Sequence, residues 1–331
     1  MGVGTWLAST PLPPFIIGLV IGVPSVILYL IEAIILIKHW TELNSSFFRL
    51  FLVRFTLNFL NYICSYMYAR LGRVGLFYEL FQSSPSVVLA IWFTFYYYAF
   101  HAENLTTMFI LINRLTSILF PLNYIKIWKH LLPLSVMVIV LVPLPFTAPM
   151  LTYGFSVRLQ ADNYTFTLAP NDGPNPLEPS LVSAISAIIF CVICGALNIA
   201  TLIVYNLKVN DENRSDKLQQ KIESKLTIYA LITFLGHLFM ALYMIAILFC
   251  CIFGDGWDFM FLATLNQLPW ISDFSTIVVP SWVLLWASNT IRELVTKELR
   301  LQEWPMIGQM LLKSKRKITF VTVSSSRSGN T

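Results

Sequence analysis

Seven long apolar segments run along the chain and constrain its fold more than any other feature. Each is about 20 residues or longer, the length that an α-helix needs to cross the hydrocarbon core of a bilayer. The segments are Pro14–Ile37, Phe48–Ala69, Ser86–Ile112, Leu131–Tyr153, Leu181–Leu207, Leu226–Phe253 and Leu265–Ala287. Only 12% of the residues are charged, whereas soluble domains carry roughly 25%. The sequence therefore predicts an all-α membrane protein, a bundle of seven transmembrane helices.

The same pattern divides the chain into four predicted parts. Residues 1–13 form an outer tail and residues 14–290 the seven-helix domain. Apolar residues near helical spacing predict an amphipathic helix at the membrane surface over residues 291–304. Residues 305–331 form a basic, serine-rich cytoplasmic tail, which either binds anionic membrane lipid or is simply solvated.

Basic residues are distributed very unevenly between the two sides of the predicted bundle. Strict alternation of the spans places 19 of the 22 Lys and Arg residues on one side and only Arg70, Arg73 and Arg158 on the other. Arg49 and Arg54 fall inside the second span, and we count them on the basic side because long side chains near a helix end can reach the interface. Since cytoplasmic loops concentrate Lys and Arg, the N-terminus is predicted outside and the C-terminus inside.

Four Asn-x-Ser/Thr sequons provide a second test of sidedness, at Asn44, Asn104, Asn163 and Asn213. The topology places Asn44 and Asn213 inside the cell and Asn104 within a helix. Only Asn163 falls in an outer loop, which is polar and rich in Pro and Gly, so it is the one predicted glycosylation site.

Searches for catalytic motifs give nothing. The sequence contains no Gly-x-Ser-x-Gly, no His-Glu-x-x-His and no Gly-rich phosphate loop. All five cysteines lie in apolar stretches, which argues for buried small side chains rather than a disulfide framework or a metal site. We therefore expect no enzyme activity, no cofactor, no metal and no nucleic-acid partner.

Polar side chains within the spans are costly in a membrane and are therefore candidates for function. Helical rise places His101 and His237 at similar depths, about 18 and 16 Å from the inner ends of their spans, with Asp273 nearer the outer end, at about 24 Å. Tyr97 lies in an aromatic run, residues 92–98, that either packs in the core or contributes an aromatic wall. Two interpretations stay open for these four residues: they line a ligand cavity, or they hold the helices together.

The third span ends in the run Asn113–Pro121, with Ile127, Trp128 and Lys129 behind it. Arg114 at this boundary is either a positive-inside anchor or a functional residue. The run resembles the signature of nematode serpentine chemoreceptors, class gamma first, with the sister class v next.

This resemblance implies a chemosensory receptor in the plasma membrane, in the cilia of sensory neurons. Such a receptor binds an environmental or pheromone-like small molecule and signals through a heterotrimeric G protein. By the same resemblance, Arg114 matches the helix-3 arginine of the wider receptor class, Asn113 replaces the usual acid, and Asn113, Arg114 and Pro121 are candidate coupling residues. The helix-3 cysteine bridge and the helix-7 Asn-Pro-x-x-Tyr of that wider class are absent. The alternative is a seven-helix carrier or channel, or a membrane protein that does not signal.

Overall fold

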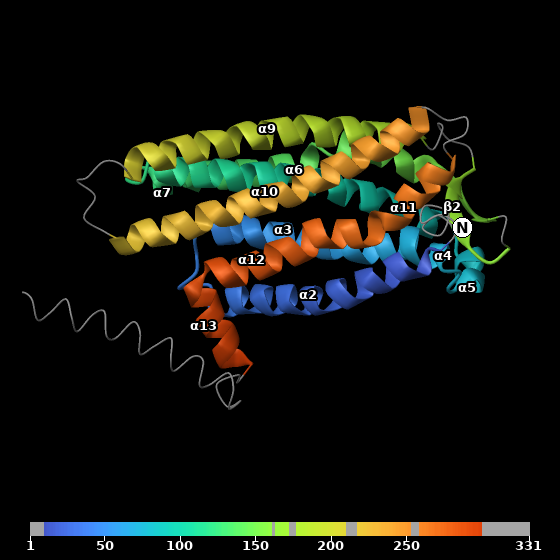
Figure 1. The fold of residues 1–331 in the computed structure, drawn as a ribbon, viewed down its shortest axis with the longest axis horizontal. Helices are drawn as coiled ribbons and strands as arrows, with labels where there is room; N and C mark the ends of the chain where they lie inside the picture. Colours follow the sequence, from blue (N-terminus) through green and yellow to red (C-terminus); the bar gives the residue numbers. More distant parts are fainter. Residues whose placement is uncertain (1–9, 161–162, 172–176, 210–216, 253–257, 300–331) are drawn as a thin grey trace, which may run out of the picture. The chain divides into compact units, whose positions relative to one another are not determined.

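The structure, a computed structural model, describes residues 10–160, 163–171, 177–209, 217–252 and 258–299 (Figure 1). Most of this part of the chain is helical. Six helical stretches are long and apolar enough to cross a membrane: Leu12–Lys38, Ser46–Arg73, Tyr124–Thr152, Leu181–Leu207, Thr227–Cys250 and Asn266–Ala287. They correspond to six of the seven predicted spans, and the prediction of a helical membrane bundle is confirmed.

The remaining predicted span is helix α6, Ser86–Leu119, which is less apolar than the other six. Its 34 residues correspond to about 51 Å at 1.5 Å per residue, which exceeds the thickness of a bilayer core. Helix α6 packs against α3, α7, α9 and α10, so much of its surface faces other helices. A helix in this position can carry polar side chains without exposing them to lipid, which explains its lower hydropathy.

The first two spans differ in how they end. Helix α2 (Leu12–Lys38) is one continuous helix. Helix α3 (Ser46–Ser65) is capped by the hydroxyl of Ser45, the residue before its first turn. It continues through a π-helical turn, η1 (Tyr66–Arg70), into α4 (Leu71–Arg73). The second span is therefore longer than predicted and includes Arg70.

The other helices follow in the order α5 (Tyr78–Ser83), α7 (Tyr124–Leu141), α8 (Leu144–Thr147), η2 (Ala148–Thr152), α9 (Leu177–Val209), α10 (Lys217–Ile252) and α11 (Asp258–Asp273). A second π-helical turn, η3 (Phe274–Val278), joins α11 to α12 (Val279–Ala287) and completes the last span. Single π turns inside longer helices occur frequently at functional sites. Here they interrupt the second and the last predicted spans.

The predicted outer loop after η2 contains an antiparallel hairpin that was not predicted from the sequence. Strands β1 (Phe155–Leu159) and β2 (Phe166–Pro170) pair with Phe155 opposite Pro170. Three apolar hairpin residues are buried in a cluster with aromatic residues of α6. Alternation of buried and exposed residues along β2 shows that one face of the hairpin covers the end of the bundle where α6 begins.

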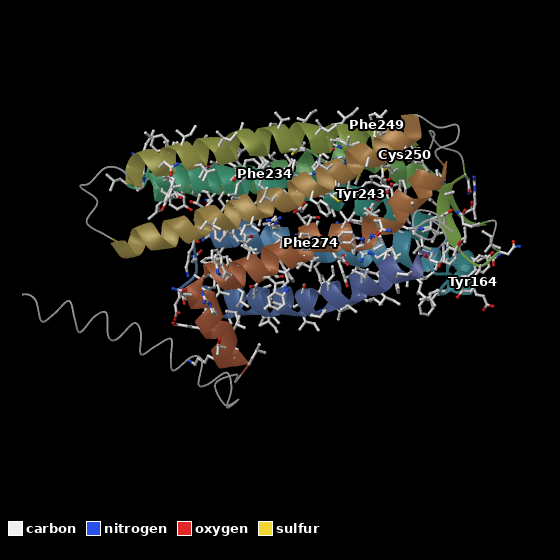
Figure 2. The ribbon with its side chains drawn as sticks, viewed as in Figure 1. Tyr164, Phe234, Tyr243, Phe249, Cys250 and Phe274 are labelled. Carbon is white, nitrogen blue, oxygen red and sulfur yellow. The ribbon has the colours of Figure 1, made fainter. Side chains whose placement is uncertain are left out.

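Exposed side chains of the bundle are largely apolar (Figure 2). On α9, Val192 and Ile199 are 68% and 60% exposed. Charged and amide side chains such as Arg54, Asn58 and Asp273 are instead completely buried. This arrangement is the reverse of a soluble protein and fits a lipid surround, in which polar groups must be satisfied within the bundle.

A separate unit begins at Ser288. Its helix α13 (Asn289–Glu298) is capped by Ser288, whose hydroxyl accepts a hydrogen bond from the backbone of Ile291 at 3.2 Å. The predicted surface helix therefore forms as far as Glu298. Its position on the membrane surface stays a prediction, and residues 1–9 and 300–331, with the predicted tail, lie outside the described residues.

Candidate functional site

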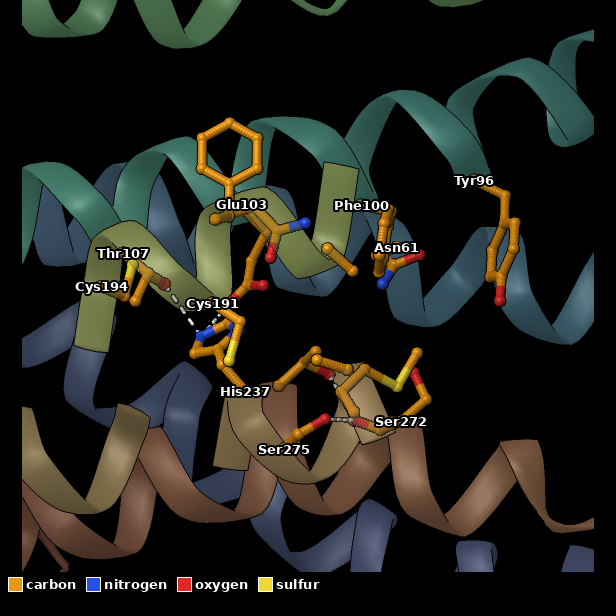
Figure 3. Close-up of a pocket in the computed structure, with 16 residues that line it drawn as sticks. Asn61, Tyr96, Phe100, Glu103, Thr107, Cys191, Cys194, His237, Ser272 and Ser275 are labelled. Carbon is orange, nitrogen blue, oxygen red and sulfur yellow. Dashed lines mark hydrogen bonds and ion pairs between the residues drawn. The ribbon is translucent and has the colours of Figure 1, made fainter. Parts of the chain in front are cut away.

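A narrow cavity lies inside the bundle between α3, α6, α9, α10 and the α11–η3 segment (Figure 3). It offers about 20 Å³ of space to the centres of water-sized molecules, which is room for about one water. The wall residues are Asn61, Tyr96, Phe100, Glu103, Asn104, Thr107, Ala187, Phe190, Cys191, Cys194, His237, Met240, Ala241, Ser272, Ser275 and Thr276. Eight of these sixteen wall residues are apolar or aromatic and eight are polar. Small-molecule sites likewise combine apolar wall residues with placed polar groups.

The polar end of the cavity is built around His237 on α10. Its Nε2 lies 2.9 Å from the Thr107 hydroxyl and 3.2 Å from the Glu103 carboxylate, both on α6, one helical turn apart. The same Nε2 lies 2.9 Å from Nη2 of Arg54 on α3. Three side chains, from α3 and α6, therefore contact one imidazole nitrogen of α10 (Figure 3 shows His237 and its two partners from α6).

Arg54 and Glu103 require opposite hydrogen-bonding states of His237 Nε2. Arg54 can only donate, so a hydrogen bond with it requires a lone pair on Nε2. Glu103, as a carboxylate, can only accept, so a hydrogen bond with it requires a proton on Nε2. The nitrogen cannot satisfy both partners at once. The cluster therefore has two alternative hydrogen-bonding arrangements, distinguished by the position of one proton.

Arg54 and Glu103 form a buried ion pair beside the cavity. Arg54 Nη2 lies 3.0 Å and Nε 3.3 Å from the same carboxylate oxygen, and the two side chains are 0% and 4% exposed. The expectation that Arg54 reaches the membrane interface is wrong. Arg54 lies eight residues, about 12 Å, into α3, and the carboxylate of α6 gives its charge a partner inside the bundle.

A second buried ion pair joins η1 to the end of α11. Arg70 donates from Nη1 and Nη2 to the two oxygens of Asp273, at 2.7 and 2.6 Å. Arg70 also stacks on the ring of Tyr66, at 4.5 Å from its centroid. The placement of Arg70 in an outer loop is therefore wrong. Removing Arg54 and Arg70 from the counts leaves 18 basic residues against 2, so the charge asymmetry persists.

Asp273, one of the four predicted cavity residues, lies outside the cavity wall. Its carboxylate is occupied by Arg70, and Gly22 of α2 lies so close that a Cβ there would be 2.8 Å from Asp273 Oδ2. This tight packing leaves no room for a ligand at the carboxylate. The geometry supports the interpretation in which Asp273 holds helices together.

At the other end of α6, Asn113 connects three helices. Its amide nitrogen donates to the Tyr124 hydroxyl of α7 at 2.9 Å and to the Ser46 hydroxyl of α3 at 3.2 Å. Arg114, 8% exposed, places its guanidinium 4.0 Å from the ring centroid of Phe47. The arginine of the signature is thus held inside the bundle by α3 in this structure.

A family model described as "Srg family chemoreceptor" matches residues 15–295, from α2 into α13. The chain belongs to the Srg chemoreceptor family. It is similar to "Serpentine receptor class gamma-31" of Caenorhabditis elegans, with 24% identity over 237 residues, which are 69% of this chain and 72% of the relative. The predicted class gamma resemblance is confirmed. The protein is thus a multi-pass membrane chemoreceptor, and its family is one of receptors and not of enzymes.

Of the four cavity residues predicted for this Srg chain, only His237 lines the cavity. His101 is buried nearby, with Nδ1 3.2 Å from the Ser186 hydroxyl of α9. Tyr97 packs among aromatic residues, 4.9 Å from Phe93 between ring centroids. His101 therefore joins α6 to α9, the Tyr97–Phe93 contact lies within α6, and neither His101 nor Tyr97 is part of the cavity wall.

Three polar cavity residues of α6 were not predicted from the sequence: Glu103, Asn104 and Thr107. Glu103 and Thr107 are four residues apart and share a helix face. A carboxylate within a span, one turn from a second polar residue on the same face, was the signal that could have found them. Pro121, the third predicted coupling residue, is exposed just beyond the end of α6.

Of the three sequons that the structure describes, Asn44 and Asn163 are exposed and Asn104 is buried. Asn163 is exposed in the hairpin turn, with a positive φ of 53° and its N–H donating to the Gln160 carbonyl at 3.0 Å. Asn104 is buried in the cavity wall, and Asn44 accepts hydrogen bonds from Arg49. Asn213 lies outside the described residues. An exposed turn is the kind of surface at which a glycan can be attached.

Proposed function

We propose that this Srg chain is a ligand-activated chemosensory receptor that signals through a heterotrimeric G protein. Its ligand, an environmental or pheromone-like small molecule, would bind in the cavity beside His237. The G protein would couple at the end of α6 that carries Asn113, Arg114 and Pro121. The receptor would reside in the plasma membrane of a sensory neuron, with its N-terminus outside as the charge asymmetry predicts.

The observation that carries this proposal is the three-helix contact at His237. Arg54, Glu103, Thr107 and His237 connect α3, α6 and α10 inside the bundle, next to the cavity. A molecule that hydrogen-bonds to any of them changes the balance between the two arrangements of the cluster. A ligand acts on a conformational equilibrium through such differential contacts.

The cavity wall also indicates what chemistry the ligand has. Within the part of the chain that the structure describes, Asn104 Nδ2 and Asn61 Oδ1 are buried without a hydrogen-bond partner. One is a donor and the other an acceptor, and both residues line the cavity. The rest of the wall includes Tyr96, Phe100 and Met240. We therefore expect a compact, mostly apolar ligand with one group that both donates and accepts hydrogen bonds, such as a hydroxyl.

The cavity must widen before such a molecule can enter. Space for about one water is far below the 300–1,000 Å³ that small-molecule sites typically enclose. The structure therefore corresponds to a closed arrangement of the helices, and ligand binding would select a more open one. Separation of α10 from α6 would lengthen the contacts from His237 to Glu103 and Thr107.

Helix α6 is the element that connects the cavity with the predicted cytoplasmic end. Glu103 and Asn113 are ten residues apart on one continuous helix, about 15 Å along its axis. A shift of α6 relative to α3 would therefore change the contact between Arg114 of α6 and Phe47 of α3. Release of Arg114 from Phe47 would present a guanidinium to a docked G protein.

Nucleotide exchange on a G protein tests the proposal. Membranes from cells that express the chain with a heterotrimeric G protein would be exposed to a panel of small hydroxylated organic molecules. At least one compound should accelerate exchange in these membranes and not in membranes that carry the Arg114→Ala variant at equal surface density. Acceleration that is identical with and without the receptor, across the whole panel, would contradict the proposal.

A further inference from the structure

A second hollow lies on the lipid-facing side of the bundle, between the start of α3 and α7. It is an open groove of about 710 Å³. Its wall consists of Arg49, Trp128, Lys129, Leu132, Pro133, Val136, Met137, Val140 and Leu141. The wall thus combines two cationic side chains, one from each helix, with seven largely apolar side chains of α7. We call this feature the α3–α7 groove.

Charge is confined to one end of the α3–α7 groove. Arg49 is in the first turn of α3 and Lys129 in the second turn of α7, and both helix ends lie on the predicted cytoplasmic side. From Lys129 to Leu141 the groove follows α7 for twelve residues, about 18 Å. One leaflet of the hydrocarbon core is about 15 Å thick, half of the whole core. The groove therefore has the length of one leaflet, with its two cations at the interface.

Arg49 is positioned before any ligand arrives. Its Nε donates to the Asn44 side chain at 2.8 Å, and its guanidinium lies 5.4 Å from the ring centroid of Trp40. Within the part of the chain that the structure describes, no acidic residue lines the groove wall. Two cations at the mouth of an apolar groove whose wall has no carboxylate are complementary to an anionic headgroup with an acyl chain.

Pro133 adds a hydrogen-bond acceptor at the same place. Proline has no N–H, so inside a helix it leaves the carbonyl of the residue four positions earlier without its usual partner. For Pro133 of α7 that residue is Lys129, and both line the groove. A headgroup that carries a hydrogen-bond donor besides its negative charge would match this carbonyl.

We propose that the α3–α7 groove is a binding site for an anionic phospholipid of the cytoplasmic leaflet, of the phosphatidylserine type. The phosphate and carboxylate would lie between Arg49 and Lys129, and the ammonium group would reach the Lys129 carbonyl. An acyl chain would follow α7 past Met137 to Val140. This site is independent of the ligand cavity and of G-protein coupling.

Native mass spectrometry of the purified full chain in detergent tests the site. The protein would be titrated with palmitoyl-oleoyl phosphatidylserine and, separately, with the phosphatidylcholine of identical acyl chains. Tighter binding of the first phosphatidylserine molecule is expected. The double variant Arg49→Gln/Lys129→Gln should weaken phosphatidylserine binding about fivefold for each charge removed. Phosphatidylcholine, which shares the phosphate but lacks the carboxylate and the net charge, should lose less affinity, so the preference for phosphatidylserine should disappear.

Two further variants distinguish a specific site from general electrostatic attraction between basic residues and an anionic lipid. Lys126→Gln removes an exposed charge one turn earlier on α7, outside the groove, and should leave the affinity within twofold of the wild-type value. Arg49→Lys keeps the charge and should retain the phosphatidylserine preference. An equal loss in Lys126→Gln and in the double variant would overturn the proposal.

The apolar part of the groove needs its own test. Val140→Phe fills the groove and should weaken binding of both phospholipids, whereas Leu134→Phe, at an exposed α7 position outside the groove, should not. Cholesterol provides a further probe in the same titration. Cholesterol binding that is tighter than that of phosphatidylserine and insensitive to the double charge variant would assign the groove to a sterol and contradict the proposal.

Discussion

Arg70 and Asp273 form a bidentate ion pair at the two π-helical turns of the bundle. Arg70 is the last residue of η1, and Asp273 immediately precedes η3. Their side chains are 1% and 0% exposed, and both guanidinium Nη atoms contact the carboxylate. The pair joins the second span to the last one, at positions where each helix changes its hydrogen-bond pattern.

Breaking this pair should destabilise the protein strongly. Asp273→Asn leaves the Arg70 charge buried without its counter-charge, which typically costs about 3–5 kcal/mol. The apparent melting temperature of the purified protein should fall markedly. The double variant Arg70→Met/Asp273→Leu removes both charges and should recover most of the loss, because buried pairs can be replaced by apolar residues at little cost. Equal destabilisation by the single and double variants would show that the ion pair itself is not the cause.

The Arg54–Glu103 ion pair should control activity in the absence of ligand. Glu103→Gln removes the charge that holds Arg54 and so weakens the connection between α3, α6 and α10. We expect ligand-independent nucleotide exchange to rise several-fold at equal surface density. Glu32→Gln is the matched control, because Glu32 is also completely buried, and neither of its oxygens has a hydrogen-bond partner among the described residues. Basal exchange that is the same in both variants argues against this role of Glu103.

Arg114 is expected to act in coupling rather than as a simple anchor. Arg114→Lys keeps the positive charge but loses the planar guanidinium that stacks on Phe47 and can make several hydrogen bonds at once. Surface expression should be retained, while most of the ligand-evoked exchange should be lost. If signalling survives in Arg114→Lys and in Arg114→Ala alike, Arg114 serves only as a positive-inside anchor.

Topology is the simplest prediction to check. An epitope tag at the N-terminus should be accessible to antibody on intact cells, and a tag at the C-terminus only after permeabilisation. In the same cells, Asn163→Gln should abolish any glycan-dependent shift in gel mobility. Asn44→Gln and Asn213→Gln are the controls and should not alter the shift. A C-terminal tag stained on intact cells would invert the topology.

Hydropathy was sufficient to locate the long helices of the bundle along the chain, and for a physical reason. Every lipid-crossing segment has to be apolar over about 20 residues, so each of the seven leaves a visible signal. The weakest of the six apolar spans of the structure, Ser46–Arg73, and the more polar α6 are the helices that carry Arg54 and Glu103. The ion pair that they share contributes to their reduced hydropathy.

The partners of the buried charges were not predictable from the sequence. Arg54 and Glu103 are 49 positions apart, and Arg70 and Asp273 are 203 apart. Helical rise gave depths along each axis, but not which face of a helix meets which neighbour. The π turns η1 and η3 also change the rotation of each helix, so a face assigned from 3.6-residue spacing no longer holds beyond them.

The candidate site could be predicted only in part, because the sequence does not show which helix face meets the cavity. His237 was identified because a histidine within a span is rare, whereas Tyr97 is one of several neighbouring aromatic residues whose directions differ by about 100° per residue. The hairpin Phe155–Pro170 was missed because its strands are only five residues long and lie in a loop segment that continues into the turn-forming residues 171–176.

The central claim is that the cavity beside His237 binds the activating ligand, and one matched pair of variants tests it most directly. Ala187 lies in the cavity wall of α9, and its neighbour Ile188 points outward and is 37% exposed. Dose–response curves for nucleotide exchange would be recorded with any compound that activates the wild-type receptor. Ala187→Phe should abolish activation at unchanged surface density, and Ile188→Phe should leave the curve as it is. A full response in Ala187→Phe would contradict binding in this cavity.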